Sequence, residues 1–314
     1  MKEACVLLTV YNGAPWLDEA LDSALAQRDV DFEVLVVDDG STDETPAILE
    51  RRAAAAPRRL RVVTIEQSGL ARARNVGFEH ARAEFVTCLD ADDRMQPLRV
   101  RLECDALRQH PEAVIAFAGR WNFDDGQDVG TYGFTPEAFG AAPDALFTAL
   151  DEPVAAMLEA GEYPGTDACT CRTEWARTKG WFRPEFRSFV DGERWIRAVH
   201  DERAVYVAAP LYERRVHDRA MSAASPDVIE NLFATVDAAR AHWDDYAPRT
   251  RRALDAFDKQ AGTWMGRRAV LTGHRARGIA HLVRHASPLA SPFWARTLAF
   301  ALMPGFVHRS WREA

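Results

Sequence analysis

Short apolar runs and amphipathic stretches alternate along the first 120 residues. Apolar or β-branched runs predict strands at Ala4–Val10, Glu33–Val37, Leu60–Ile65, Glu84–Leu89 and Ala113–Ala118. Between them, apolar residues recur at helical spacing and predict helices at Trp16–Ala26, Glu44–Ala56, Leu70–Ala81 and Leu98–Gln109. Continuous apolar strands that alternate with helices are typical of a mostly parallel sheet with helices on both faces. The sequence therefore predicts an α/β fold.

Polar residues gather where three of these strands end. Thr9, Val10 and Tyr11 close the first strand, DDGSTD follows the second from Asp38, and DADD follows the fourth from Asp90. Asp and Ser are ordinary cap and turn residues, so one such cluster alone would indicate nothing. Acids at two strand ends meet at one edge of the sheet, where ligands of such folds bind, and their repulsion requires a cation or donor groups. We therefore expect a binding site at this edge.

The acidic cluster of Asp90, Asp92 and Asp93 favours a hard divalent cation. Mg²⁺ and Mn²⁺ prefer carboxylate oxygen and leave coordination positions open for substrate phosphates. The third predicted helix adds amide donors and Arg74 for an anion, whereas Arg72 fits a solvated face. The glycine patterns of dinucleotide-binding and phosphate-binding loops are absent. The predicted ligand is a metal-bound phosphate ester.

From about Ala4 to Ser222, the chain resembles a family 2 glycosyltransferase with the GT-A fold. The segments that carry the resemblance follow the family's order and spacing: VLLTVYNGAPWLDEALDSALAQ, FEVLVVDDGSTDET, SGLARARNVG, FVTCLDADD, CRTEWARTKGWF, VDGERWIRAV and PLYERRVHDRAMS. The resemblance implies a Rossmann-like sheet, a nucleotide diphosphate sugar as donor, with a UDP-sugar favoured, and transfer to a hydroxyl with inversion. It also implies Mg²⁺ or Mn²⁺ as cofactor and a saccharide or lipid-linked saccharide as acceptor, in envelope polysaccharide or glycolipid synthesis.

The same resemblance assigns the donor-binding residues. Thr9, Val10 and Tyr11 match the segment beside the nucleotide base, where the tyrosine ring can stack. Asp39 matches the acid that recognises uracil and ribose, and Arg74 matches an arginine near the nucleotide and diphosphate. These residues come from three segments that the predicted sheet brings to one edge.

The metal would be held by the acidic cluster and one histidine. Asp90, Asp92 and Asp93 match the metal and ribose cluster, with Asp92 the first choice of metal ligand and Asp93 a close rival. His217 matches a loop histidine that in some members reaches the metal or the diphosphate. A lone surface histidine without a function is the alternative for His217.

Asp191 matches the general base, which must lie within hydrogen-bond reach of the acceptor hydroxyl and opposite the leaving diphosphate. The family's usual Glu-Asp pair reads Val190-Asp191 in this chain. A positioning role of the missing Glu would fall to another residue, for which Glu193 is a candidate. Helix capping is the alternative role of Asp191.

Residues 120–140 are rich in aromatic residues, Gly and Asp, which predicts a hairpin or a mobile loop. Aromatic side chains offer apolar faces to the C–H groups of sugars. The candidates for such an acceptor platform are Trp121, Tyr132, Trp181 and Trp195, with core packing as the alternative for each. The identity of the acceptor cannot be read from this region.

The charge of the chain divides between its two parts. The formal net charge is −8, but residues 259–314 hold nine basic residues and one acid, so the remainder carries −16. We predict a catalytic domain over 1–222, with a nucleotide-binding half at 1–119 and an acceptor and base half at 120–222, and a basic helical extension over 223–314. Helical patterns within the extension lie at Val228–His242, Arg249–Thr272, Ile279–Arg284 and Phe293–Met303.

The extension suits an interfacial helix that binds an anionic membrane surface, a helix packed on the acidic domain, or a homodimer interface. A nucleic acid partner is not expected, because no RNA-binding motif accompanies the charge.

Five cysteines, with only a lone C-x-C pair at Cys169 and Cys171, favour reduced thiols over a zinc site. With no signal peptide or spanning helix expected, we predict a cytoplasmic location, including the inner face of the membrane. A sugar-phosphate nucleotidyltransferase and a noncatalytic nucleotide-sugar-binding protein are the competing interpretations.

Overall fold

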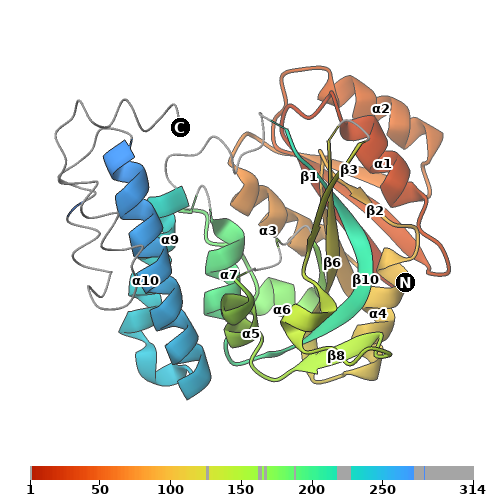
Figure 1. Cartoon of the computed structure of the whole chain (residues 1–314). Coiled ribbons are helices and arrows are strands. Elements are labelled where there is room, and N and C mark those ends of the chain that lie inside the picture. Colours follow the sequence, from red (N-terminus) through yellow and green to blue (C-terminus); the bar gives the residue numbers. More distant parts are fainter. Residues whose placement is uncertain are drawn as a thin grey trace. The chain divides into compact units, whose positions relative to one another are not determined.

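The computed structural model describes residues 2–124, 127–161, 165, 168–186, 189–217, 228–271 and 279 (Figure 1). The chain divides into two compact units, Met1–Ala247 and Pro248–Ala314. In the second unit, the described structure is the helix α10 (Pro248–Leu271) together with residue 279. Helix α9 (Val228–Ala241) belongs to the first unit and packs on α7 (Val190–Ala198). The predicted domain boundary at residue 222 stays a prediction.

A ten-stranded sheet is the centre of the first unit among the described residues, with the order β3-β2-β1-β4-β9-β6-β10-β5 and with β7 beside β6 and β8 beside β10. The strands β1 to β4 run parallel to one another, and β10 runs parallel to β6. The short β9 lies antiparallel between β4 and β6 and joins the two groups. The bounds are β1 Ala4–Val10, β2 Phe32–Asp38, β3 Leu60–Thr64, β4 Phe85–Asp90, β5 Arg94–Met95, β6 Ala113–Asp124, β7 Gln127–Gly133, β8 Phe147–Leu150, β9 Cys169–Arg172 and β10 Arg203–Arg215.

Helices cover both faces of this sheet. On one face, alternate residues of β1 pack against apolar residues of α1 and α4. On the other face, α3 approaches β1 so closely that a Cβ on Gly77 would lie 2.3 Å from the Cδ1 atom of Leu7. The bounds are α1 Leu17–Leu25, α2 Thr45–Ala55, α3 Leu70–His80, α4 Arg99–Gln109, α5 Pro153–Ala160 and α6 Thr173–Thr178, with 3₁₀ turns η1 at Pro136–Phe139 and η3 at Trp243–Asp245.

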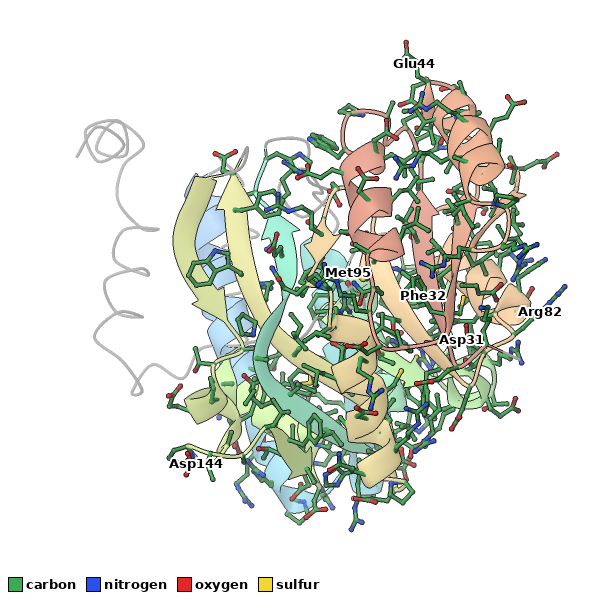
Figure 2. All side chains as sticks on the ribbon, turned by 90° about the vertical axis from the view of Figure 1, so that its right-hand side faces the viewer. Asp31, Phe32, Glu44, Arg82, Met95 and Asp144 are labelled. Atoms are coloured by element: carbon green, nitrogen blue, oxygen red, sulfur yellow. The ribbon has the colours of Figure 1, made fainter. Side chains whose placement is uncertain are left out.

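Burial follows the apolar pattern of the sequence. The four buried residues of α1 recur at helical spacing, and β1 is buried along its whole length. Figure 2 shows the packed side chains, with Phe32 and Met95 in the core and Glu44, Arg82 and Asp144 at the surface.

The structure confirms the predicted strands and helices of the first 120 residues and the mostly parallel sheet. The hairpin predicted within residues 120–140 is formed by β6 and β7. The two predicted helices nearest the carboxyl end, 279–284 and 293–303, fall outside the described residues apart from residue 279. Within the described part of the chain, none of the helices combines the length and the hydrophobicity that crossing a membrane requires.

The five cysteines are all buried, and all five are free thiols, the state that the sequence favoured. Burial raises the pKa of Cys88 to about 12, so this side chain stays a neutral thiol at physiological pH. Cys169 and Cys171 contact the backbone carbonyls of Gly165 and Val86, respectively. In the described residues, the group with metal-ligand spacing is instead the acidic cluster of Asp90, Asp92 and Asp93.

Candidate active site

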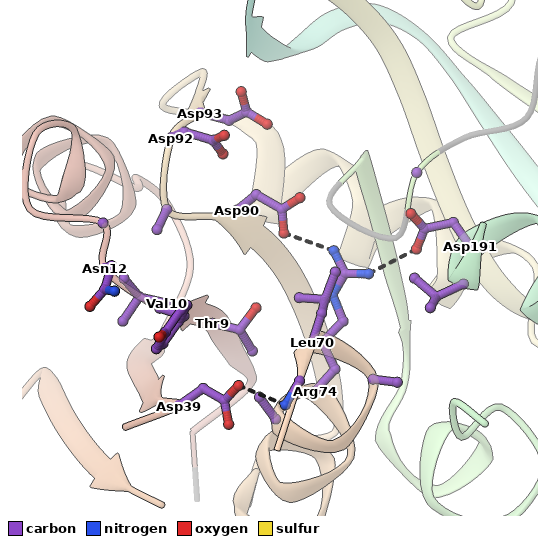
Figure 3. Close-up of a pocket in the computed structure, with 18 of the residues that line it drawn as sticks. Thr9, Val10, Asn12, Asp39, Leu70, Arg74, Asp90, Asp92, Asp93 and Asp191 are labelled. Carbon is purple, nitrogen blue, oxygen red and sulfur yellow. Dashed lines mark hydrogen bonds and ion pairs between the residues drawn. The ribbon is translucent and has the colours of Figure 1, made fainter. Parts of the chain in front are cut away.

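A cleft of about 1070 Å³ opens at the carboxyl ends of β1 and β4 (Figure 3). The residues that the sequence predicted for donor binding, the metal and the base all line this cleft: Thr9, Val10, Tyr11, Asp39, Arg74, Asp90, Asp92, Asp93, Asp191 and His217. They come from six separate segments of the chain, and the sheet brings them together. Their shared location is thus observed, whereas the role of each stays a prediction.

Asp39 holds the beginning of α3. Its Oδ1 atom accepts hydrogen bonds from the backbone amide of Ser68 at 2.7 Å and from the Ser68 hydroxyl at 2.9 Å, and its Oδ2 atom accepts from the Gly69 amide at 2.8 Å. These amides precede the first turn of the helix, where donors lack helical partners and a negative charge is favourable. The buried carboxylate therefore fixes the helix that carries Arg74 into the cleft.

The loops after β1 and β2 are bound to each other. The side-chain oxygen of Asn12 accepts from the backbone amides of Thr42 and Asp43, at 2.8 and 3.3 Å, and the backbone amide of Asn12 donates to the Ser41 hydroxyl. Asn12 adopts the left-handed conformation, with φ of 51°, which Asn tolerates better than most residues. Tyr11, beside it, is 45% exposed and leaves its ring available to a planar ligand.

Arg74 links the two halves of the site. Its side chain is only 2% exposed, and it donates to Asp90 Oδ1 at 2.8 Å and to Asp191 Oδ1 at 2.9 Å (Figure 3). The guanidinium also lies 5.3 Å from the ring centroid of Phe182. The planar fork of an arginine suits two carboxylates at once. One side chain thus fixes an acid at the end of β4 and an acid on α7.

Asp191 lies in the first turn of α7, and the structure argues against Glu193 as its positioning residue and against helix capping as its role. The suggested substitute for the missing acid, Glu193, is buried and accepts from Arg197 Nε at 2.6 Å, so the contact that holds Asp191 comes from Arg74. The residue before α7, Phe189, has a φ of 57° and no side-chain cap, and the Asp191 carboxylate turns to Arg74 rather than capping the helix. The Asp191 side chain is 26% exposed, which leaves it accessible from the cleft.

The three acids after β4 differ in their partners. Ligand oxygens of Asp90, Asp92 and Asp93 all lie within 4.8 Å of one another. Asp93 is buried and accepts from the Tyr212 hydroxyl and, at 2.6 Å, from the backbone amide of Arg215. Asp90 is bound by Arg74. Asp92 is therefore the acid with the most freedom to coordinate a cation.

His217 completes this cluster from the end of β10. Its Nε2 atom lies 3.0 Å from Asp92 Oδ2, and its ring packs on Trp16 with centroids 4.1 Å apart. Neighbouring ligands at about 2.1 Å from an octahedral Mg²⁺ lie roughly 3 Å apart, so the observed spacing of this nitrogen and oxygen fits a shared cation. The donor set of Asp92 and His217, with Asp93 behind it, could hold Mg²⁺ or Mn²⁺.

Arg215 and Tyr212 were not found by sequence reasoning, although they fix this corner of the site. The Arg215 Nε atom donates to the backbone carbonyl of Asp92 at 2.9 Å, and its guanidinium pairs with Glu19 on α1. The end of β10, two residues before His217, is thereby attached to the acidic segment. The RR pair in LYERRVH was the available signal, but its spacing along a strand does not show which arginine points into the sheet edge.

The predicted aromatic platform is wrong for Trp195, which is fully buried and packs on Phe117 with ring centroids 5.7 Å apart. Trp181 is 41% exposed but lies against Arg197 and is not part of the cleft wall. Trp121 is also absent from the cleft wall, and the side chain of Tyr132 lies outside the described residues. The apolar wall beside Asp191 is formed by Pro184, Phe186 and Phe189.

The amino-terminal part of the chain is similar to a known protein family. Residues 5–144 match the family described as Glycosyl transferase family 2. Over 102 residues the chain is 41% identical to the succinoglycan biosynthesis protein ExoO of Rhizobium meliloti (strain 1021), a match that covers 32% of this chain and 28% of that protein. Over 119 residues it is 31% identical to chondroitin synthase of Escherichia coli, covering 38% of this chain and 17% of that protein. The matches thus span less than a third of these relatives.

Solved structures show the fold over nearly the whole chain. S. aureus TarS 1–349 in complex with UDP-GlcNAc superposes with a TM-score of 0.62 at 19% identity, over 95% of this chain and 80% of that one. The mannosyltransferase PcManGT from Pyrobaculum calidifontis, in complex with GDP-Man and Mn²⁺, gives 0.56 at 20% identity, over 99% and 83%. Residues 5–144 thus match glycosyltransferase family 2, as the motifs predicted, and the structural likeness confirms the predicted GT-A fold.

Proposed function

We propose that this protein transfers a sugar from a nucleotide diphosphate donor, preferably a UDP-sugar, to a hydroxyl group of a saccharide or lipid-linked saccharide, with inversion. The observation that carries the proposal is the Arg74 bridge. One guanidinium binds both Asp90 and Asp191. Asp90 belongs to the acidic cluster at the end of β4, and Asp191 is the candidate base. The complexes of TarS with UDP-GlcNAc and of PcManGT with GDP-Man support a nucleotide sugar as donor.

In this mechanism Asp191 is the general base. Arg74 binds its Oδ1 atom, and Oδ2 makes no hydrogen bond within the described residues, so it can accept a proton from the acceptor hydroxyl. The hydroxyl oxygen forms a bond to the anomeric carbon as the bond from that carbon to the diphosphate oxygen breaks. The electron pair leaves with the nucleoside diphosphate, and a single displacement inverts the anomeric centre.

The leaving group would be bound at the acidic cluster. Asp92 and His217, with Asp93 as the rival ligand, would hold Mg²⁺ or Mn²⁺ there, and a bound cation supplies positive charge to the departing diphosphate. Tyr11 would stack on the base, while Thr9 and Val10 line the same wall of the cleft. Asp39 would meet the nucleotide while it holds the start of α3.

A thermal-shift panel tests the metal and donor site. Nucleotide diphosphates near 100 times their Kd are expected to stabilise the protein by about 2.7 kcal/mol, or roughly 5 °C, in the presence of Mn²⁺ and much less without it. Asp92→Asn should remove the Mn²⁺-dependent part, because the amide is a weak ligand for a hard cation. Asp237→Asn, at an exposed site on α9, is the matched control. Absence of a metal-dependent shift with every nucleotide diphosphate would refute the assignment.

The setting of the reaction is envelope polysaccharide or glycolipid synthesis at the inner face of the membrane. Support comes from the relatives named for succinoglycan biosynthesis and for teichoic acid polymerisation, and from the +8 of residues 259–314, most of which lie outside the described residues. The full chain is expected to float with vesicles that contain anionic lipid, and to float less after Arg296→Ser, Arg309→Ser and Arg312→Ser. If flotation depends neither on the anionic lipid nor on these three arginines, a protein contact is favoured for the extension instead.

A further inference from the structure

Arg120 is a cation in the cleft wall that has no acidic partner among the described residues. It projects from β6, where its backbone pairs with Gly133 on β7 and Tyr212 on β10. Arg74 and Arg215 line the same cleft, but both are held by carboxylates. The Nε atom of Arg120 is buried without a hydrogen-bond partner in the described structure. A buried donor without an acceptor is unfavourable, and in native proteins it calls for an explanation such as a ligand.

The Arg120 side chain rests on an aromatic ring rather than on an acid. Its guanidinium carbon lies 4.7 Å from the ring centroid of Phe134, which is buried. Phe134 is fixed in turn, because it adopts a φ of 60° and its carbonyl accepts from the hydroxyl of the buried Tyr206 at 2.5 Å. A ring face orients a guanidinium and leaves its N–H groups available. Arg120 is thus held in place without its charge being neutralised.

The acids of the cleft do not need this cation. Each of the five cleft carboxylates already has a donor or a cation beside it. Asp39 is bound by the start of α3, Asp90 and Asp191 by Arg74, Asp92 by His217, and Asp93 by Tyr212 and the Arg215 amide. The charge of Arg120 is therefore left for an anion that enters the cleft, and an arginine fork matches a carboxylate or phosphate group.

The place of Arg120 in the sheet indicates where this anion would come from. The residues proposed for the nucleotide lie at the ends of β1 and β2 and on α3, and the acids of the proposed metal site follow β4, from which β9 separates β6. On its other side β6 pairs with β10, which leads to His217 of that metal site, so Arg120 lies beyond the metal site as seen from the nucleotide strands. We propose that Arg120 binds a carboxylate or phosphate group of the acceptor, so that the acceptor is an anionic saccharide. This inference rests on the proposed function, since it assigns the acceptor side of the same cleft.

Pairs of small probes that differ only in charge test the inference on the full chain. Glucuronate is compared with glucose, and glycerol 3-phosphate with glycerol, by ligand-observed NMR, with and without saturating UDP and Mn²⁺. The acidic member of at least one pair should bind about 10-fold or more tightly than the neutral one, also when UDP is present. Arg120→Gln should lower the affinity for the acidic probe by about 10- to 100-fold, the usual range for a charge-assisted hydrogen bond. Arg120→Lys should lower this affinity by less.

Arg72→Gln is the matched control, because Arg72 is an exposed arginine of α3 that is not part of the cleft wall. Circular dichroism of each variant separates misfolding from lost binding. Equal binding of the charged and neutral probes, or unchanged binding of the acidic probe by Arg120→Gln, would overturn the inference. A loss confined to UDP affinity would assign Arg120 to the donor diphosphate and would likewise overturn it. Failure of the proposed function would appear separately, as absence of UDP binding by the wild-type chain.

Discussion

Asp191→Asn is expected to lower the rate of sugar transfer by about 10²- to 10⁴-fold, the usual contribution of a general base. The substitution is nearly isosteric, and the amide oxygen can still accept the Arg74 hydrogen bond that holds Oδ1 at 2.9 Å. What the amide cannot do is take the proton of the acceptor hydroxyl. Nucleotide affinity should therefore change less than threefold, which calorimetric titration with UDP and Mn²⁺ would measure alongside turnover.

The control for this substitution is Asp201→Asn, because Asp201 is a half-exposed acid near the other end of α7 and pairs with Lys179 at the surface. It should leave turnover close to wild type. An Asp191→Asn enzyme that retained more than a tenth of wild-type turnover would remove Asp191 from the role of base. A parallel loss of nucleotide affinity would instead indicate that the substitution disturbs the cleft.

Arg74→Ala is expected to affect both stability and turnover. Removing the 2%-exposed guanidinium leaves Asp90 and Asp191 facing each other without a cation, and breaking such a pair typically costs 3–5 kcal/mol. Both acids are about a quarter to a third exposed, so we expect a smaller loss, about 2–3 kcal/mol in the free energy of unfolding. Turnover should fall about 100-fold or more, because the base is no longer held. Urea unfolding and a transfer assay measure the two effects.

Arg74→Lys separates these two effects. A lysine restores one positive charge but not the planar fork that holds two carboxylates, so stability should recover more than turnover. Arg72→Ala, on the exposed face of the same helix, should shift stability by less than about 0.5 kcal/mol. Equal turnover of the Arg74→Lys and wild-type enzymes would show that charge alone, and not the bridge, matters for the base.

Most of the nucleotide half was predictable because β1, β2 and β4 are buried along nearly their whole length and α1 carries one apolar stripe. β1 is apolar throughout, and α1 repeats its buried residues at helical spacing, so each pattern has one reading. The position of the site followed from the topology, since acids at the ends of parallel strands must meet at one edge. The motif resemblance then supplied residues such as Asp191 that lie far from that edge in sequence.

The contacts within the site could not be predicted from the sequence, because they join segments that lie far apart along the chain. Arg74 and Asp191 are 117 residues apart, and no local pattern indicates that they form an ion pair. The choice of Glu193 as the positioning residue failed for a related reason. Its spacing suits a helix neighbour of the base, but Arg197, four residues farther along α7, binds it instead. The role of Trp195 could not be inferred from the residue type, because a tryptophan ring can either pack in the core or contact a sugar.

The position of β9 governs the order in which the chain can assemble. This four-residue strand, Cys169–Arg172, covers one edge of β4 and one edge of β6, although it begins 84 and 56 residues after those strands begin. During synthesis, both edges stay open until residue 172 has left the ribosome, and open edges invite wrong strand pairing. A nascent chain stalled before that point has a nucleotide half with an incomplete sheet. The nucleotide-binding half is therefore not expected to mature as an independent module, because its sheet is completed only after more than half of the chain has been made.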